Sequence, residues 1–102
     1  MAFTEQRIVV GDTIDFNVYW RKDGVTWNIT GGAITLFLKN PAGTVTSYSA
    51  TISSGTEGLA HYLAAGSILD QAGTWVRQWK AVVSGVTLYT EQIEFDVLQA
   101  LG

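Results

Sequence analysis

The 102-residue sequence has no cysteine, a single histidine and only six lysine and arginine residues. The absence of cysteine excludes a disulfide framework and any thiolate metal site. A surface that follows a phosphate backbone needs clustered cations, but the six in this chain are scattered. With a formal net charge of −3, the chain is therefore expected to have no nucleic acid partner.

Long apolar runs are missing as well. No stretch approaches the roughly 20 apolar residues of a membrane-spanning helix, so no membrane partner is expected. Residues 1–6 lack the basic start and apolar run of a signal peptide, which predicts synthesis and assembly in a cytoplasm. The length suits a single domain over residues 1–102. Because charged residues make up only 15% of the chain, part of the apolar surface is expected to meet a partner.

What the sequence does contain is apolar alternation with a period of two, which is typical of strands. The longest example predicts a hairpin of residues 73–83 and 86–98 around a turn at Ser84-Gly85. The apolar side chains that share one side of each strand are Trp75, Trp79, Ala81 and Val83, and then Tyr89, Ile93, Phe95 and Val97. Both sets can face one core only if the connection has an odd length or a bulge, which we predict near residues 84–86.

Shorter strands are predicted at regular spacing along the rest of the chain. Residues 13–20 alternate cleanly, Asp23-Gly24 predicts a tight hairpin turn, and residues 33–39 form another alternating strand. Residues 44–52 are extended but polar, which predicts an exposed or edge strand.

The segment from residue 59 to residue 72 is less clear. Residues 59–63 predict a strand that could bury either Leu59, His61 and Leu63 or Ala60 and Tyr62. A single helical turn is expected over residues 67–71. About seven short strands without a helical period indicate an all-β fold, an antiparallel two-sheet sandwich.

Catalytic candidates are few. His61 has no cysteine to activate, and the serines lie in turn-like settings, so a buried or solvated strand histidine is the favoured interpretation. Glu94 and Asp96 lie about 7 Å apart along one strand face, as an inverting glycosidase pair would, but every acidic pair two residues apart in a strand shows this spacing. If Ile93, Phe95 and Val97 face inward, the favoured interpretation is that the two carboxylates are a solvated face. We therefore predict no enzymatic activity, no cofactor and no metal site.

Arg77 interrupts the apolar side that carries Trp75 and Trp79. A buried guanidinium needs a partner, so we predict that Glu91 accepts it, with stacking on a tryptophan ring as a further contact. The alternative is that Arg77 lies near the open end of the sandwich and extends to water.

Three aromatic residues, Tyr19, Trp27 and Tyr48, are predicted at the outside or in loops and are the candidate partner-binding residues. Flat rings of this kind could also bind the faces of sugars. The competing interpretation is that they lie at the rim of a core filled by the other tryptophans, because rings more often pack than bind ligands.

The order of the motifs carries a resemblance. The sequence runs GDTIDFNV at 11–18, KDGVTWNITG at 22–31 and ITLFLKNPAGTV at 34–45, and later contains LDQAGTW at 69–75. It resembles the immunoglobulin-like β domains of virion proteins from tailed bacteriophages, and is most similar to the N-terminal domain of baseplate upper proteins. The match covers nearly the whole chain, but it consists of turn and core residues.

The resemblance implies a non-enzymatic structural part of the virion. Such a protein docks on the capsid or tail, in symmetric copies or as a homo-oligomer, with other virion proteins as its partners. Baseplate proteins of this type continue into receptor-binding modules, whereas this sequence stops at Gly102, which favours a decoration, neck or tail component. The expected contact segments are residues 44–52, 1–6 and 98–102. The alternative function is a carbohydrate-binding β-sandwich module.

Overall fold

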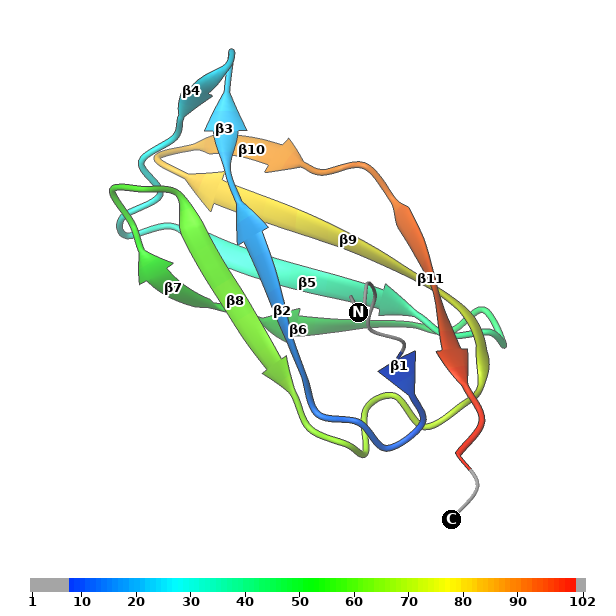
Figure 1. Ribbon diagram of the computed structural model, residues 1–102. Coiled ribbons are helices and arrows are strands. Elements are labelled where there is room, and N and C mark those ends of the chain that lie inside the picture. Colours follow the sequence, from blue (N-terminus) through cyan, green and yellow to red (C-terminus); the bar gives the residue numbers. More distant parts are fainter. Residues whose placement is uncertain (1–7, 101–102) are drawn as a thin grey trace, which may run out of the picture.

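The computed structural model describes residues 8–100, and every regular element in that range is a β-strand (Figure 1). The predicted all-β fold is therefore confirmed. The strands are β1 (Ile8–Val9), β2 (Ile14–Tyr19), β3 (Arg21–Lys22), β4 (Val25–Thr26), β5 (Ala33–Lys39), β6 (Val45–Ser49), β7 (Thr51–Ser54), β8 (Leu59–Ala64), β9 (Gly73–Val83), β10 (Val86–Tyr89) and β11 (Ile93–Leu98).

The strands form two main sheets and a short hairpin. The six-stranded sheet has the order β1-β11-β9-β5-β6, with β10 also paired to β9, and the three-stranded sheet has the order β2-β8-β7. β3 and β4 form the hairpin around Asp23-Gly24, as predicted. All pairs are antiparallel except β1–β11, in which Ile8 lies opposite Val97 in a parallel ladder. The prediction of a purely antiparallel sandwich is therefore wrong for this pair, because β1 runs in the same direction as β11.

The two main sheets face each other (Figure 1). Alternate side chains from both sheets fill the space between them. The inward-facing apolar residues of β5 and β9 are almost fully buried, in the two-residue period of a strand. The buried core comprises Phe16, Trp20, Ile29, Ile34, Leu36, Leu38, Ala60, Ala64, Leu69, Trp75, Trp79, Ala81, Val83 and Val97.

The strand with ambiguous facing, β8, buries its alanines. Its partner β2 buries Phe16, and Phe16 lies opposite Tyr62, so Tyr62 and its alternate neighbours Ala60 and Ala64 face the core. His61 therefore lies on the outer face. The predicted helical turn over residues 67–71 is not formed: this segment begins with a hydrogen-bonded turn in which the Ile68 N–H donates to the Ala65 carbonyl.

The long hairpin contains the predicted register adjustment, but at a different place. Val83 lies opposite Val86, so Ser84-Gly85 is a two-residue turn, with φ of 52° and 81° at its two residues. Both residues have the positive φ that tight hairpin turns demand, and no bulge is needed there. The extra residue lies at 90–92 instead, because Tyr89 is opposite Lys80 whereas Ile93 is opposite Arg77.

Thr90 holds this bulge. Its N–H donates to the Trp79 carbonyl, and its hydroxyl oxygen accepts a hydrogen bond from the Trp79 N–H at 2.9 Å. The Thr90 carbonyl in turn accepts from the Gln78 amide. The two-residue turn places Tyr89 beside Lys80 on the outer face. The bulge then returns Phe95 to the inner face, opposite the buried Trp75, as predicted. The prediction that Tyr89 shares the inner side is therefore wrong.

The polar segment 44–52 is divided between the two sheets. β6 is the last strand of the six-stranded sheet and β7 the last strand of the three-stranded sheet, joined through Ala50. The predicted edge position is confirmed. The other expected contact segments, 1–6 and 98–102, lie wholly or partly outside the described residues, with Leu98 the last residue of β11.

Candidate functional site

The single histidine forms an exposed pair. Nδ1 of His61 on β8 lies 2.8 Å from Oδ1 of Asp15 on β2, at the outer face of the three-stranded sheet. Thr51 lies opposite His61 in the ladder between β7 and β8. Since both members of the pair are open to solvent, it is an ordinary surface interaction and not a nucleophile–base arrangement.

The paired carboxylates Glu94 and Asp96 also lie on an outer face. They alternate with Phe95, which packs against the core, and both are exposed. Asp96 accepts a hydrogen bond of 3.0 Å from the Thr74 hydroxyl on the neighbouring strand. The solvated-face interpretation is the one that their positions favour. Among residues 8–100, no cluster of three or more histidine or acidic side chains could hold a metal ion.

The three candidate aromatic residues are not brought together. Tyr48 lies on β6 and stacks on Tyr62 of β8, with ring centroids 4.9 Å apart. Trp27 is half-buried, with its ring edge-on to that of the core residue Trp20 at 6.2 Å. Of the three, only Tyr19 is exposed, and the Arg21 guanidinium carbon lies 4.8 Å from its ring centroid.

Tyr48 has a perturbed environment. Burial raises the pKa of its hydroxyl above the usual 10.0, and the neighbouring Tyr62 and Asp70 raise this pKa further. A hydrogen bond with Thr46 partly opposes the shift in pKa. Tyr48 is therefore part of the packing between the sheets, and it lines a hollow together with Ser67, Ile68 and Asp70.

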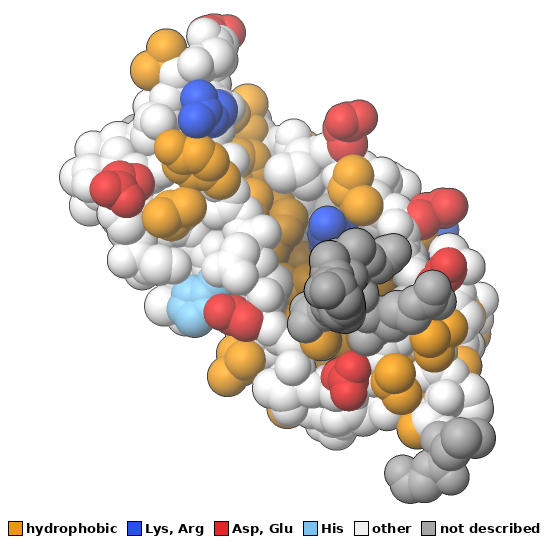
Figure 2. Space-filling model, in the orientation of Figure 1, with side chains coloured by type: hydrophobic (Ala, Val, Ile, Leu, Met, Phe, Trp, Pro, Cys, Tyr) orange, Lys and Arg blue, Asp and Glu red, His pale blue; other side chains and the backbone are white. Residues whose placement is uncertain are grey.

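An exposed tyrosine that the alternation pattern missed lies across a hollow from Tyr19. The hollow, of about 540 Å³, lies between the β3–β4 hairpin and β10. Figure 2 shows this side of the molecule, with hydrophobic side chains gathered at the base of the opening. Its wall on the β10 side includes Tyr89, Thr90 and Glu91. Tyr89 faces outward because the two-residue turn at Ser84-Gly85 places it opposite Lys80. The length of that turn is the sequence signal that could have located this site.

The predicted pair between Arg77 and Glu91 is not formed. Among residues 8–100 the only ion pair within 4.0 Å joins His61 and Asp15. The bulge removes Glu91 from the ladder, so that Ile93 lies opposite Arg77. Arg77 is half-buried, and its guanidinium carbon lies 5.8 Å from the ring centroid of Phe95, so the aromatic contact involves a phenylalanine instead of a tryptophan.

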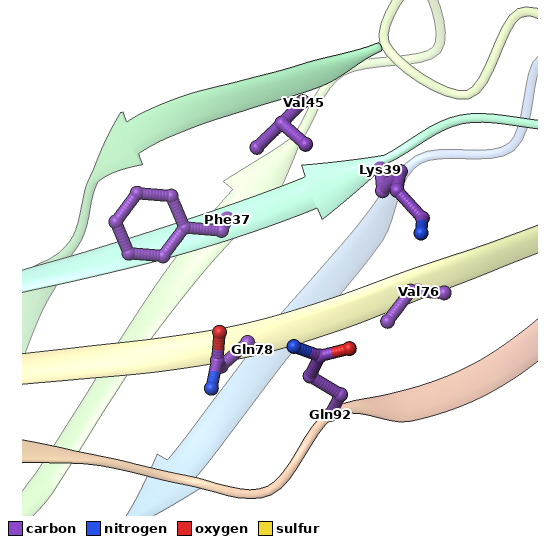
Figure 3. A pocket seen from close by; sticks show the side chains of 6 residues that line it. All are labelled: Phe37, Lys39, Val45, Val76, Gln78 and Gln92. Carbon is purple, nitrogen blue, oxygen red and sulfur yellow. The ribbon is translucent and has the colours of Figure 1, made fainter. Parts of the chain in front are cut away.

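A second hollow lies on the outer face of the six-stranded sheet (Figure 3). It has a volume of about 210 Å³ and is lined by Phe37, Lys39, Val45, Val76, Gln78 and Gln92. Figure 3 shows the amides of Gln78 and Gln92 side by side, with Lys39 near Val76 and the ring of Phe37 on the neighbouring strand. Alternation predicts that Phe37 and Lys39 share one outer face. That Val45, Val76, Gln78 and Gln92 lie beside them follows only from the pairing of the strands.

The edge formed by β6 and β7 is a further candidate contact surface. Residues 44–54 contain no charged side chain and no proline. Natural sheets usually protect exposed edges with lysine, proline or other devices, because an unprotected edge can pair with another strand. This edge lacks both kinds of residue along its whole length.

The comparisons with known proteins give no assignment. No protein-family model matches this sequence, and no curated protein matches it either. Within residues 8–100 there is no helix that is long and apolar enough to cross a membrane.

Proposed function

We propose that this chain is a non-enzymatic structural protein of a bacteriophage virion, with an immunoglobulin-like fold, that docks on the capsid or tail as a decoration, neck or baseplate adaptor component. The sheet orders support the immunoglobulin-like assignment. The orders β5-β9-β11 and β2-β8-β7 follow the C-F-G and B-E-D strand orders of immunoglobulin domains. The extra strand β6 beside β5 has the position of the additional C′ strand in variable-type domains.

The observation that carries the docking role is the uncharged edge of β6 and β7. Both strands end their sheets, and the single residue Ala50 joins them, so two free edges are adjacent. A stable isolated protein would be expected to protect such an edge, whereas a component of an assembly has it covered by a neighbour. Other virion proteins are the proposed partners, and the proposed location is the virion, after assembly in the cytoplasm of the host bacterium.

The test introduces lysines at this edge. We expect the double variant Ser49→Lys and Thr51→Lys, whose two sites are exposed on either side of Ala50, to lose co-sedimentation with phage particles that lack this protein. The matched control is Thr13→Lys with Thr56→Lys, which adds the same charge at exposed sites outside both strands. Failure of the unmodified chain to bind particles would contradict the docking role. Equal binding by both double variants would contradict the edge as the contact.

A carbohydrate-binding module is the second candidate, and the hollow between Tyr19 and Tyr89 favours it. Both residues are about half exposed, at 49% and 57%, and Glu91 supplies a carboxylate beside them as a hydrogen-bond acceptor. A glycan array should then show binding that Tyr19→Ala and Tyr89→Ala abolish. Trp27→Phe is the control, because Trp27 packs against Trp20. An array without binding would eliminate this candidate.

A further inference from the structure

We propose that the outer face of the six-stranded sheet, around Val76, is the contact between two copies of this chain related by a two-fold axis that runs along β9. Val76 faces outward because it alternates with the buried Trp75. The proposal specifies one symmetric contact, and it does not depend on a virion role, since it concerns the purified chain alone.

The charge pattern of this face is self-complementary. One row across the sheet reads Val45, Lys39, Val76 and Glu94, as the ladder registers give it. Lys39 and Glu94 lie on the strands to either side of β9, each displaced from it by about 4.8 Å. A two-fold rotation about an axis along β9 places Lys39 of one copy over Glu94 of the other, and the reverse. The two Val76 side chains then meet on the axis.

Neighbouring rows fit the same operation. In the next row Phe37 lies opposite Gln78, and Gln92 of the bulge lines the same hollow. The rotation brings Phe37 over Gln92 of the second copy, while the two Gln78 amides meet at the axis and can donate to one another. Lys80, one row further, lies 5.8 Å from the Tyr89 ring centroid, which draws its ammonium group toward β10 and away from its symmetry mate.

The overlap of the two faces suits a small dimer. About an axis along β9, the strand positions shared by both copies are those of β5, β9 and β10 with β11, which gives a width of about 14 Å at the usual strand spacing. β9 has 11 residues, about 36 Å at the usual rise per residue. The product is roughly 500 Å² per copy, or roughly 1,000 Å² for the pair, at the low end for a specific interface. The half-buried Phe37 and Val76 supply apolar area to this overlap.

Charge reversal tests the symmetry directly. In Lys39→Glu both inter-copy contacts become glutamate with glutamate, and in Glu94→Lys both become lysine with lysine. We expect each variant to raise the dimer dissociation constant about 30-fold in sedimentation equilibrium at low salt, equivalent to about 2 kcal/mol.

An equimolar mixture of the two variants restores both contacts. In a dimer with one copy of each, the introduced glutamate of the first copy lies over the introduced lysine of the second. The native Glu94 of the first copy likewise lies over the native Lys39 of the second. The mixture should therefore dimerise as tightly as the unmodified chain.

Matched controls keep the net charges of the two variants. Lys22→Glu changes the formal net charge from −3 to −5, as Lys39→Glu does, and Glu57→Lys changes it to −1, as Glu94→Lys does. Both control sites are exposed in turns or short strands outside this face. They should leave the dissociation constant within about threefold of the unmodified value.

Three outcomes would overturn the proposal. The first is a chain that stays monomeric at millimolar concentration, whether or not it binds phage particles. The second is a dimer that the reversal variants and their controls affect equally, which would place the contact elsewhere, such as the β6–β7 edge. The third is a weakened dimer in each single variant with no recovery in the mixture, because recovery is what the two-fold pairing requires.

Discussion

Replacement of Gly58 by alanine tests how tightly the loop before β8 packs on the start of the β3–β4 hairpin. Gly58 is buried and has φ of +73°, in the left-handed region. Its carbonyl accepts a hydrogen bond of 2.8 Å from the Trp20 N–H. A Cβ at this position would lie 2.6 Å from the Trp20 carbonyl oxygen and 2.9 Å from the Trp27 carbonyl oxygen, so the backbone itself must move.

The expected cost has two parts. A left-handed conformation costs a non-glycine residue roughly 1–2 kcal/mol, of which reduced freedom of the unfolded chain offsets about half. Relief of the two backbone contacts resembles overpacking and costs about 1–3 kcal/mol more. We therefore expect Gly58→Ala to lower the free energy of unfolding by about 3 kcal/mol, a large share of the roughly 5–15 kcal/mol typical of a domain.

Urea denaturation followed by tryptophan fluorescence measures the effect. With a slope of about 1.5 kcal/mol per molar urea, a loss of about 3 kcal/mol shifts the midpoint by about 2 M. Gly43→Ala is the control, because Gly43 also has a positive φ, +94°, but a Cβ there would meet nothing within 4 Å. If Gly58→Ala costs no more than Gly43→Ala, the contact argument is refuted and only the backbone conformation matters.

Three further predictions address single side chains. Because the folded-state pKa of Tyr48 is raised, its contribution to stability is present below pH 10.0 and is lost as the pH rises through that folded-state pKa. Tyr48→Phe should therefore lessen the loss of unfolding free energy at alkaline pH, with Tyr89→Phe as the control. Identical profiles of stability against pH for the two variants would contradict this. Thr90→Val leaves the Trp79 N–H without its acceptor and should lower the free energy of unfolding by about 1–3 kcal/mol in urea denaturation. Thr87→Val, on the exposed side of β10, should leave it nearly unchanged. Equal effects of the two substitutions would argue against a role for the Thr90 hydroxyl in the bulge. His61→Ala should cost less than about 1 kcal/mol, because the pair with Asp15 is exposed, and a larger loss would mean that His61 has a packing role.

The sequence predicted the strands well wherever one face is buried. Residues 14–19 and 33–39 alternate between core and solvent, so the two-residue period alone locates β2 and β5 and assigns their faces. β8 remained ambiguous because both of its alternate sets contain apolar residues. The ladder with β2 decides it, and that ladder is a long-range contact that no local pattern encodes.

The candidate sites were harder to predict because they depend on register. The register adjustment lies at 90–92 and not at 84–86, so the two-residue turn leaves Tyr89 facing outward and the bulge takes Glu91 away from Arg77. A single misplaced bulge therefore changed two expectations at once. The edge at residues 44–52 was predictable, because its lack of charge and its polar composition are local properties. The row of Lys39, Val76 and Glu94 joins three strands distant in sequence, and alternation places each residue on a face without saying which ones are neighbours.

The bulge at 90–92 also limits how this protein can change in length. It places one extra residue between the β9–β10 ladder and the β9–β11 ladder, and Thr90 hydrogen-bonds this segment to β9. Deletion of one residue here would remove the bulge and turn Glu94 and Asp96 inward, toward the tryptophans. Added residues would only enlarge an exposed loop and leave the facing of β11 unchanged. Residues 90–92 should therefore tolerate insertions, in natural variants and in engineered ones, but not deletions.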